Sequence, residues 1–312
     1  RYDVTDVSTA LKAGVDPASL QWPETIESRL GIPRRLLPEV VLPGTPVGRV
    51  TSEAAAATGL PAGVPVVAGA TDGLAGCLAS GAKEPGDLNV TLGTTLIFKA
   101  ISPQPLLDPD GVVYNHRHPA GGYLPGAASS TGAEWVEAFF RGEDLERLGR
   151  EAAARLPTRQ TVYPLVKTGE RFPFARATAA GFGWEQIDDP VARFAAGMEG
   201  TAFLERLGID RLEHLGLRIG ATVYATGGAV AGETWLRIRA AISGRTFSVP
   251  RYPQCAVGAA VLAAMPHLGG CREAVAALVR PGRMVEPEPR LAAAYTEPLE
   301  RFRTALRERG WL

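Results

Sequence analysis

The alternation of strand and helix patterns along the chain is the feature that most limits its fold. Residues 64–70 form an apolar run that ends at Thr71-Asp72-Gly73. Residues 88–92 alternate apolar and polar side chains and then turn at Gly93-Thr94-Thr95 into a second apolar segment. Farther along, short strand patterns, one of them near residues 112–114, alternate with helical ones, the clearest of which follows Asp189-Pro190. An antiparallel start followed by interleaved strands and helices predicts an α/β fold.

Three loops carry residues suited to phosphate chemistry. A hairpin tip such as Gly93-Thr94-Thr95 offers backbone N–H groups and hydroxyls to a phosphate, and a carboxylate such as Asp72 can accept a proton from an attacking hydroxyl. Gly227-Gly228-Ala229 stands between a predicted strand and a helix that begins near Glu233, where small residues let an anion approach the helix amino end. Taken alone, each loop also has a structural interpretation, because Asp72 is more typical of a helix cap and the glycines are typical of tight turns.

The charge balance and the cysteine content limit the kinds of partner and the cellular environment that we expect for the chain. The chain has 33 basic and 33 acidic residues without a block of either sign, so neither nucleic acid nor a membrane surface is predicted as a partner. No apolar run approaches the roughly 20 residues that span a bilayer. Cys77, Cys255 and Cys271 are odd in number and far apart, which argues against a disulfide framework and indicates a reducing cytoplasm. We therefore expect a small-molecule partner.

Two pairs of nearby polar residues are more typical of local structure than of a ligand site. His116 and His118 share one face of a predicted strand, but they lack a third metal ligand at suitable spacing, so no metal site is predicted there. Glu170 and Arg171 could form an ion pair that braces the surrounding lobe, or they could remain solvated.

The order of the motifs carries more information than any one of them. The series runs from Thr5 to the helix around Tyr295 and comprises Thr71-Asp72-Gly73, Gly93-Thr94-Thr95, Tyr163-Pro164-Leu165, Gly169-Glu170-Arg171-Phe172-Pro173, Met198-Glu199-Gly200, Gly227-Gly228 through Trp235, and Gly258-Ala259-Ala260. This ordered series resembles the FGGY carbohydrate kinases. Within that family it looks most like the ribulokinase and xylulokinase-like members, especially the small D-ribulose kinases.

The resemblance implies an actin-like ATPase (ribonuclease H-like) fold in which two lobes clamp ATP and sugar. On this interpretation residues 1–79 end the N-terminal sugar-binding lobe, residues 80–254 form the C-terminal nucleotide-binding lobe, and residues 255–312 are helices that return toward the first lobe. The family opens with a strand-hairpin whose Asp and Gly-Thr pair hold magnesium and the terminal phosphates, and the sequence has no counterpart. We therefore expect roughly 150 further residues upstream, from ordinary domain sizes, and no catalytic competence without them.

The resemblance also implies roles for individual residues. Asp72 resembles the catalytic base, which also contacts the sugar. Gly93, Thr94 and Thr95 resemble the second phosphate loop. The residues that resemble the adenosine motif are Gly227, Gly228, Ala229, Gly232 and Trp235, and a core role is the alternative for Trp235. The implied cofactors are ATP and Mg²⁺, and the magnesium ligands are expected mainly in the upstream segment.

The adenosine motif departs from the family pattern at two positions. The family commonly has Gly-Gly-Gly-Ala-Lys/Arg-Asn/Ser here. Ala229 adds a methyl group where a third glycine is usual, and Gly232 removes a polar side chain expected near the base or ribose. We expect these two changes to alter the affinity for the nucleotide or the selectivity for its base.

The resemblance implies a cytoplasmic kinase that transfers the ATP γ-phosphate to a primary hydroxyl of a ketopentose, D-ribulose or D-xylulose, or of a related polyol. Three alternatives stay open: a kinase for another polyol such as glycerol, a slow ATPase, and a non-catalytic clamp that senses nucleotide or sugar. The sequence identifies neither the sugar nor the oligomeric state, for which a homodimer is one option.

Overall fold

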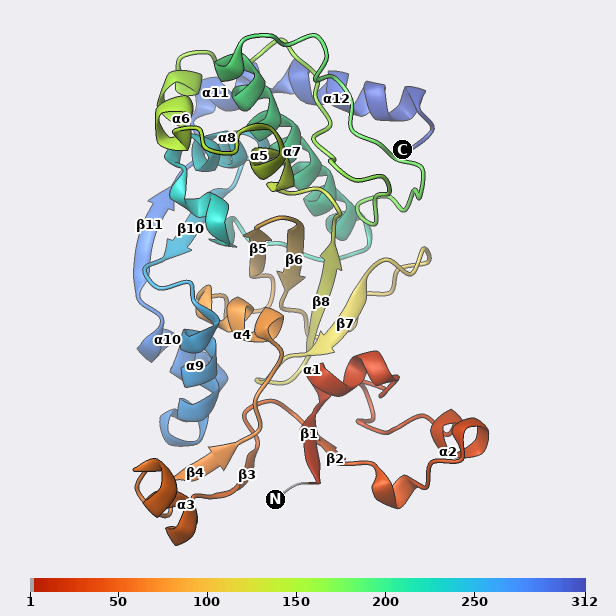
Figure 1. Cartoon of the computed structure of the whole chain (residues 1–312), viewed down its shortest axis with the longest axis vertical. Helices are drawn as coiled ribbons and strands as arrows, with labels where there is room; N and C mark the ends of the chain where they lie inside the picture. The colour runs from red at the N-terminus through yellow and green to blue at the C-terminus, as the bar shows by residue number, and fades with distance from the viewer. Residues whose placement is uncertain (1–2) are drawn as a thin grey trace.

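A computed structural model describes residues 3–312 and is organised around one mixed sheet of seven strands (Figure 1). In spatial order the strands are β11 (Pro281–Val285), β10 (Thr246–Pro250), β9 (Thr222–Thr226), β5 (Leu88–Leu92), β6 (Leu96–Ala100), β8 (Tyr123–Ala128) and β7 (Tyr114–Arg117). The predicted hairpin of β5 and β6 is confirmed, with Leu92 opposite Leu96. On its other side β5 pairs in parallel with β9, so segments more than 120 residues apart are neighbours at the centre of the sheet.

Alternate residues of the central hairpin face opposite sides of the sheet. Leu88, Val90 and Phe98 belong to the main core, where the Phe98 ring packs against Gly208 of α7 (Pro190–His214). The same core takes apolar residues of α8 (Glu233–Ser243) and of α12 (Thr296–Glu308). Figure 1 shows these three helices at the top, together with α5 (Glu134–Phe139), α6 (Leu145–Ala153) and α11 (Pro289–Ala294).

The opposite face of the hairpin is polar at its centre. Asn89 and Thr91 of β5 point to this side, as do their pairing partners Lys99 and Thr226. The helices α4 (Asp72–Ala79), α9 (Cys255–Leu268) and α10 (Cys271–Leu278) form a second core together with Leu124 of β8. A polar strip in the middle of a sheet that a helix covers is unusual, because buried polar groups need partners.

The N-terminal segments lie at the bottom of the molecule in Figure 1 and form two small sheets. β1 (Val4–Asp6) pairs in parallel with β2 (Glu39–Val41), and β3 (Pro46–Arg49) pairs antiparallel with β4 (Pro65–Val67). The intervening elements are α1 (Val7–Ala10), η1 (Leu11–Ala13), α2 (Thr25–Leu30), η2 (Arg34–Leu36) and α3 (Ser52–Thr58).

The predicted buried strand at residues 64–70 is wrong in extent and in burial. The strand covers only Pro65–Val67, and Val66 is 42% exposed. Among the described residues β4 pairs with β3 alone, so its other edge stays open.

Two of the predicted helices are confirmed, and one strand is shifted. Asp189 caps α7 by accepting hydrogen bonds from the N–H groups of Val191 and Ala192, and α8 begins at Glu233. The strand expected around residues 112–114 instead begins at Tyr114, because the Asp108 carboxylate accepts the N–H groups of residues 112 and 113 in a turn. Within residues 3–312 no helix is both long and apolar enough to cross a membrane.

Candidate functional site

Asp72 occupies the first turn of α4, after the N-cap residue Thr71. Its carboxylate is exposed and accepts a hydrogen bond from the N–H of Gly73 at 2.6 Å. A carboxylate in a first helical turn is stabilised by the helix dipole, yet the cap position itself belongs to Thr71. The Asp72 side chain is therefore open to a ligand.

Two neighbouring elements hold the start of α4 in place. The N–H of Thr71 donates to the Ser8 hydroxyl of α1 at 3.0 Å, and Ser8 in turn donates to the carboxylate of Asp6. From the other side, the Cys255 thiol at the start of α9 donates to the Asp72 carbonyl oxygen at 3.4 Å. The position of Asp72 thus depends on segments from both ends of the chain.

The hairpin tip at Gly93, Thr94 and Thr95 is anchored on one side and open on the other. The Gly93 carbonyl accepts the N–H of Ala133 at 2.8 Å, which attaches the tip to the loop before α5. Within residues 3–312 the hydroxyls of Thr94 and Thr95 have no hydrogen-bond partner, and Thr94 is exposed. Free hydroxyls on an anchored tip suit an oxyanion ligand.

The loop at Gly227 lies directly beside the end of β5. Gly227 has a φ of +91°, and a Cβ there would lie 2.3 Å from the Leu92 carbonyl oxygen, so only glycine fits. The short helix η3 (Gly228–Ala231) follows, with Gly228 and Gly232 exposed and Ala229 partly buried. Because β5 and β9 are parallel neighbours, this loop and the hairpin tip emerge from the same edge of the sheet, where α/β folds bind ligands.

Trp235 has two alternative predicted roles, in the adenosine motif or in the core, and the structure places its side chain in the core. Its side chain is 5% exposed, and its ring centroid lies 5.6 Å from that of Trp135. The indole N–H donates to the Met198 carbonyl at 3.1 Å. The structure therefore places Trp235 beneath the Gly227 loop, with its polar atom already used.

Glu170 braces the surrounding lobe, as one of its two sequence interpretations predicts, but it does so through hydroxyl groups. It is 3% exposed, and one carboxylate oxygen accepts the hydroxyls of Ser129, Thr131 and Tyr163 at 2.6–3.0 Å. Neither alternative for the pair is confirmed, because Glu170 is buried and the Arg171 guanidinium donates to Ser130 Oγ and to the Ser129 carbonyl instead. Glu170 thus braces the segment that anchors the hairpin tip.

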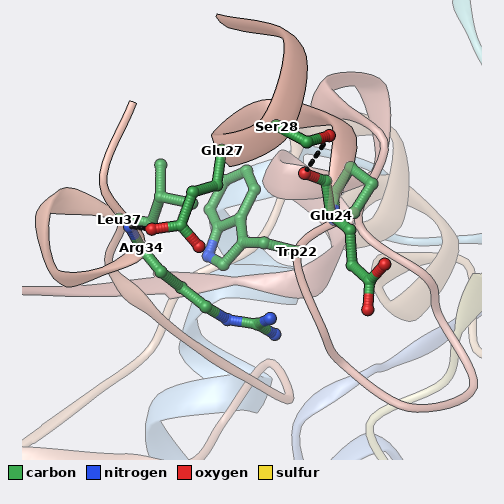
Figure 2. A pocket seen from close by; sticks show the side chains of 7 residues that line it. Trp22, Glu24, Glu27, Ser28, Arg34 and Leu37 are labelled. Carbon is green, nitrogen blue, oxygen red and sulfur yellow. Dashed lines mark hydrogen bonds between the residues drawn. The ribbon is translucent and has the colours of Figure 1, made fainter. Parts of the chain in front are cut away.

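Two other polar regions show no ligand-binding arrangement. Within residues 3–312 no three His, Cys, Asp or Glu side chains gather as a metal site, and this includes the surroundings of His116 and His118. A pocket beside α2, lined by Trp22, Glu27 and Arg34 among others, lies apart from the three loops (Figure 2). Two of its charged side chains already have partners, because Arg34 donates to Gln21 Oε1 at 2.9 Å and Glu27 accepts the Arg34 N–H at 3.4 Å.

Comparison with known proteins decides the family. Residues 88–267 match the C-terminal domain of the FGGY family of carbohydrate kinases, and residues 2–79 match its N-terminal domain. The chain belongs to the FGGY family. This confirms the resemblance in motif order, and the matched ranges place Asp72 in the N-terminal domain and both glycine loops in the C-terminal domain.

Individual FGGY proteins resemble the chain over most of its length. It is 30% identical to an autoinducer-2 kinase of Yersinia enterocolitica over 280 residues, covering 83% of this chain and 53% of that protein. A xylulose kinase from Rhodospirillum rubrum superposes with a TM-score of 0.81 at 27% identity, over 98% of this chain and 64% of that one. A kinase from Brucella ovis, described as a xyloylose kinase, superposes with a TM-score of 0.85 at 26% identity, over 97% and 64%.

These superpositions confirm the predicted α/β, actin-like ATPase fold of the FGGY kinases. The chain spans about half the length of the curated relatives it matches. The lobe boundaries at residues 79 and 254 stay predictions.

Proposed function

We propose that this FGGY chain takes part in ATP-dependent phosphorylation of a primary hydroxyl of a ketopentose or related polyol, with Asp72 as the general base. The observation that supports this is the exposed carboxylate of Asp72 at the start of α4, next to Gly73, whose backbone approaches Lys99 of β6, the strand that follows the Gly93 hairpin tip. Phosphoryl transfer requires mainly that donor and acceptor be aligned and that charge be stabilised.

Each loop has a distinct part in the proposed reaction. Bound ATP supplies the γ-phosphoryl group. The free hydroxyls of Thr94 and Thr95 donate to phosphate oxygens, and the open backbone of Gly227 and Gly228 admits the nucleotide. Asp72 accepts the proton of the acceptor hydroxyl as the hydroxyl oxygen attacks the γ-phosphorus, and the bond from that phosphorus to the bridging oxygen breaks, which releases ADP.

Magnesium is not assigned to residues of this chain. Among residues 3–312 no cluster of three acidic, His or Cys side chains is present, and Asp72 alone is an insufficient ligand set for an ion that prefers six oxygen ligands. The expectation that the magnesium ligands lie mainly in an upstream segment stays a prediction.

Coupled ADP release from the natural full-length protein tests the proposal. We expect ADP formation that depends on D-ribulose or D-xylulose, with glycerol as a comparison acceptor. Turnover with glycerol alone would contradict the ketopentose assignment, and ADP release without any acceptor would favour an ATPase. Nucleotide binding that increases with sugar but yields no ADP would favour a non-catalytic clamp, for which the altered adenosine motif at Ala229 and Gly232 is the supporting feature.

A further inference from the structure

Lys99 lies on the polar face of the central hairpin, beside the start of α4. It stands near the end of β6, opposite Asn89 of β5 and Gly126 of β8. The residue is 4% exposed, although lysine is among the residues least often buried. The burial of a lysine in the middle of a covered sheet therefore requires a structural or functional explanation.

Two glycines leave room for the Lys99 side chain. A Cβ on Gly73, the residue after Asp72, would lie 3.3 Å from Lys99 Cε and 3.9 Å from Nζ. On the other side, Gly126 lets the Tyr114 ring pack against its backbone, and the Lys99 ammonium lies 5.3 Å from the centroid of that ring. The amine thus reaches the first turn of α4, next to the candidate base.

The amine has no anionic partner within residues 3–312. No carboxylate oxygen lies within 4.0 Å of Nζ there, and Nζ donates no hydrogen bond to those residues. Asp6 forms no ion pair with Lys99, and its carboxylate accepts hydrogen bonds from Ser8 and Thr9. Most of the Lys99 side chain is buried, but its Nζ atom is not fully enclosed, so a ligand can reach the unpaired ammonium and replace the water it contacts.

The remaining charges around Lys99 do not neutralise it. Burial lowers the pKa of the Lys99 amine, Asp72 and Cys77 act in the opposite direction, and Lys12 adds a second positive charge. His116 on β7 faces the same region, and burial together with Lys99 lowers its pKa to about 4, so it is neutral at pH 7. The positive charges of Lys99 and Lys12 favour a ligand atom that accepts hydrogen bonds.

We propose that Lys99 is a specificity-determining residue of the acceptor site, where its ammonium binds a carbonyl or carboxylate oxygen of the acceptor. An ammonium has three donors and no acceptor, so it matches an oxygen that carries no hydrogen better than it matches a hydroxyl. Lys99 then distinguishes a ketose or a sugar acid from the corresponding alditol. The inference rests on the proposed function for the location of the acceptor beside Asp72.

Matched acceptor pairs test the inference in the natural full-length protein. The pairs are D-xylulose with xylitol, D-ribulose with ribitol, and D-gluconate with D-glucitol, so the first two report a ketone and the third a carboxylate. Sites built around a hydrogen bond reject analogues that lack it. We expect Lys99→Met to lower kcat/KM for the preferred carbonyl or carboxylate compound roughly 10- to 100-fold, as for a hydrogen bond to a charged group, and to leave kcat/KM for its alditol within about twofold.

Two further variants control for folding and charge. Lys99→Gln keeps a donor at a similar position and should lose less than Lys99→Met. Lys167→Met removes a lysine that is exposed and paired with Glu134 at 2.7 Å, and it should change neither member of any pair.

Calorimetric titration of the same compounds separates this inference from the proposed function. If Lys99→Met loses ketose or sugar-acid affinity at least tenfold but no compound is phosphorylated, the kinase assignment fails and the role of Lys99 stands. If kcat/KM ratios and affinities within each pair are the same in Lys99→Met and the unaltered protein, Lys99 has no role in selecting the acceptor. Binding of none of the six compounds to the unaltered protein would likewise overturn the inference.

Discussion

Gly258 of α9 lies directly against Ala75 of α4, so closely that a Cβ at position 258 would stand 1.8 Å from the Ala75 carbonyl oxygen. This contact fixes the distance between the two helices three residues from Asp72. The small-residue pattern Gly258-Ala259-Ala260 predicts such an approach from sequence. The packing of α9 is therefore a determinant of where the candidate base lies.

We expect Gly258→Ala to force α4 and α9 apart and to lower the free energy of unfolding by about 1–3 kcal/mol, as overpacked core substitutions do. Urea unfolding monitored by circular dichroism measures this. The matched control is Gly149→Ala in α6, where a Cβ meets nothing within 4 Å. That substitution should stabilise the protein by about 0.5–1 kcal/mol through helix propensity, and an equal loss in both variants would contradict the packing argument.

Gly227→Ala should disturb the loop at the end of β9. The residue has a positive φ, and its Cβ would meet the Leu92 backbone, so the loop must move away from the hairpin. We expect nucleotide affinity, measured by calorimetry, to fall at least tenfold. Gly228→Ala is the control, because its Cβ has open space and its φ is not positive, and it should retain a fold with unchanged thermal stability.

Glu170→Ala should weaken the anchor of the hairpin tip. The substitution leaves the hydroxyls of Ser129, Thr131 and Tyr163 without their shared acceptor. Because buried polar groups without partners are unfavourable, the free energy of unfolding should fall by about 2–4 kcal/mol. Glu170→Gln keeps one acceptor oxygen and should lose less. Thermal unfolding of both variants provides the comparison, and an undiminished melting temperature in Glu170→Ala would disprove the bracing role.

The stability of the protein should decline as the pH falls from about 6.5 to 4. Burial lowers the pKa of His118 to about 4, from an ordinary value of 6.5, and its Nδ1 accepts the N–H of Ala120 at 3.2 Å. In this window the unfolded chain binds a proton that the folded chain does not. The contribution of His118 to the free energy of unfolding is therefore fully present above pH 6.5. Below that pH it decreases by up to about 1.4 kcal/mol per pH unit.

Urea unfolding at several pH values between 7.5 and 4.5 measures this dependence. His118→Asn cannot titrate in this range but can still accept the Ala120 N–H, so its stability should vary less with pH. An unchanged slope in the variant would show that His118 is not responsible, and His116, whose pKa burial also lowers to about 4, would be examined next.

Local patterns predicted the elements that carry the site, but not the contacts between them. The β5–β6 hairpin and the start of α8 each follow from residues near one another in sequence. The order of motifs then indicated the family and the fold.

The environments of Lys99 and Glu170 could not be derived in the same way. Their neighbours are Gly73 and Tyr114 for Lys99, and a serine and a threonine about 40 residues away for Glu170, and no local periodicity specifies such contacts. The alternation of residues 88–92 indicated a strand with one polar face, but only the packing of Gly73 beside Lys99 and of α4 against Leu124 shows that α4 lies on this face.

The assignment of Asp72 as general base is tested most directly by comparing Asp72→Asn with Asp188→Asn in the full-length protein. Asp188 is exposed and has no hydrogen-bond or ion-pair partner among residues 3–312, so it serves as the matched control. Acceptor-dependent ADP release should fall about 10²- to 10⁴-fold in Asp72→Asn, as expected for loss of a general base, and should be unchanged in Asp188→Asn. Nucleotide affinity should be similar in both. Turnover by Asp72→Asn within twofold of the unaltered protein would contradict the assignment.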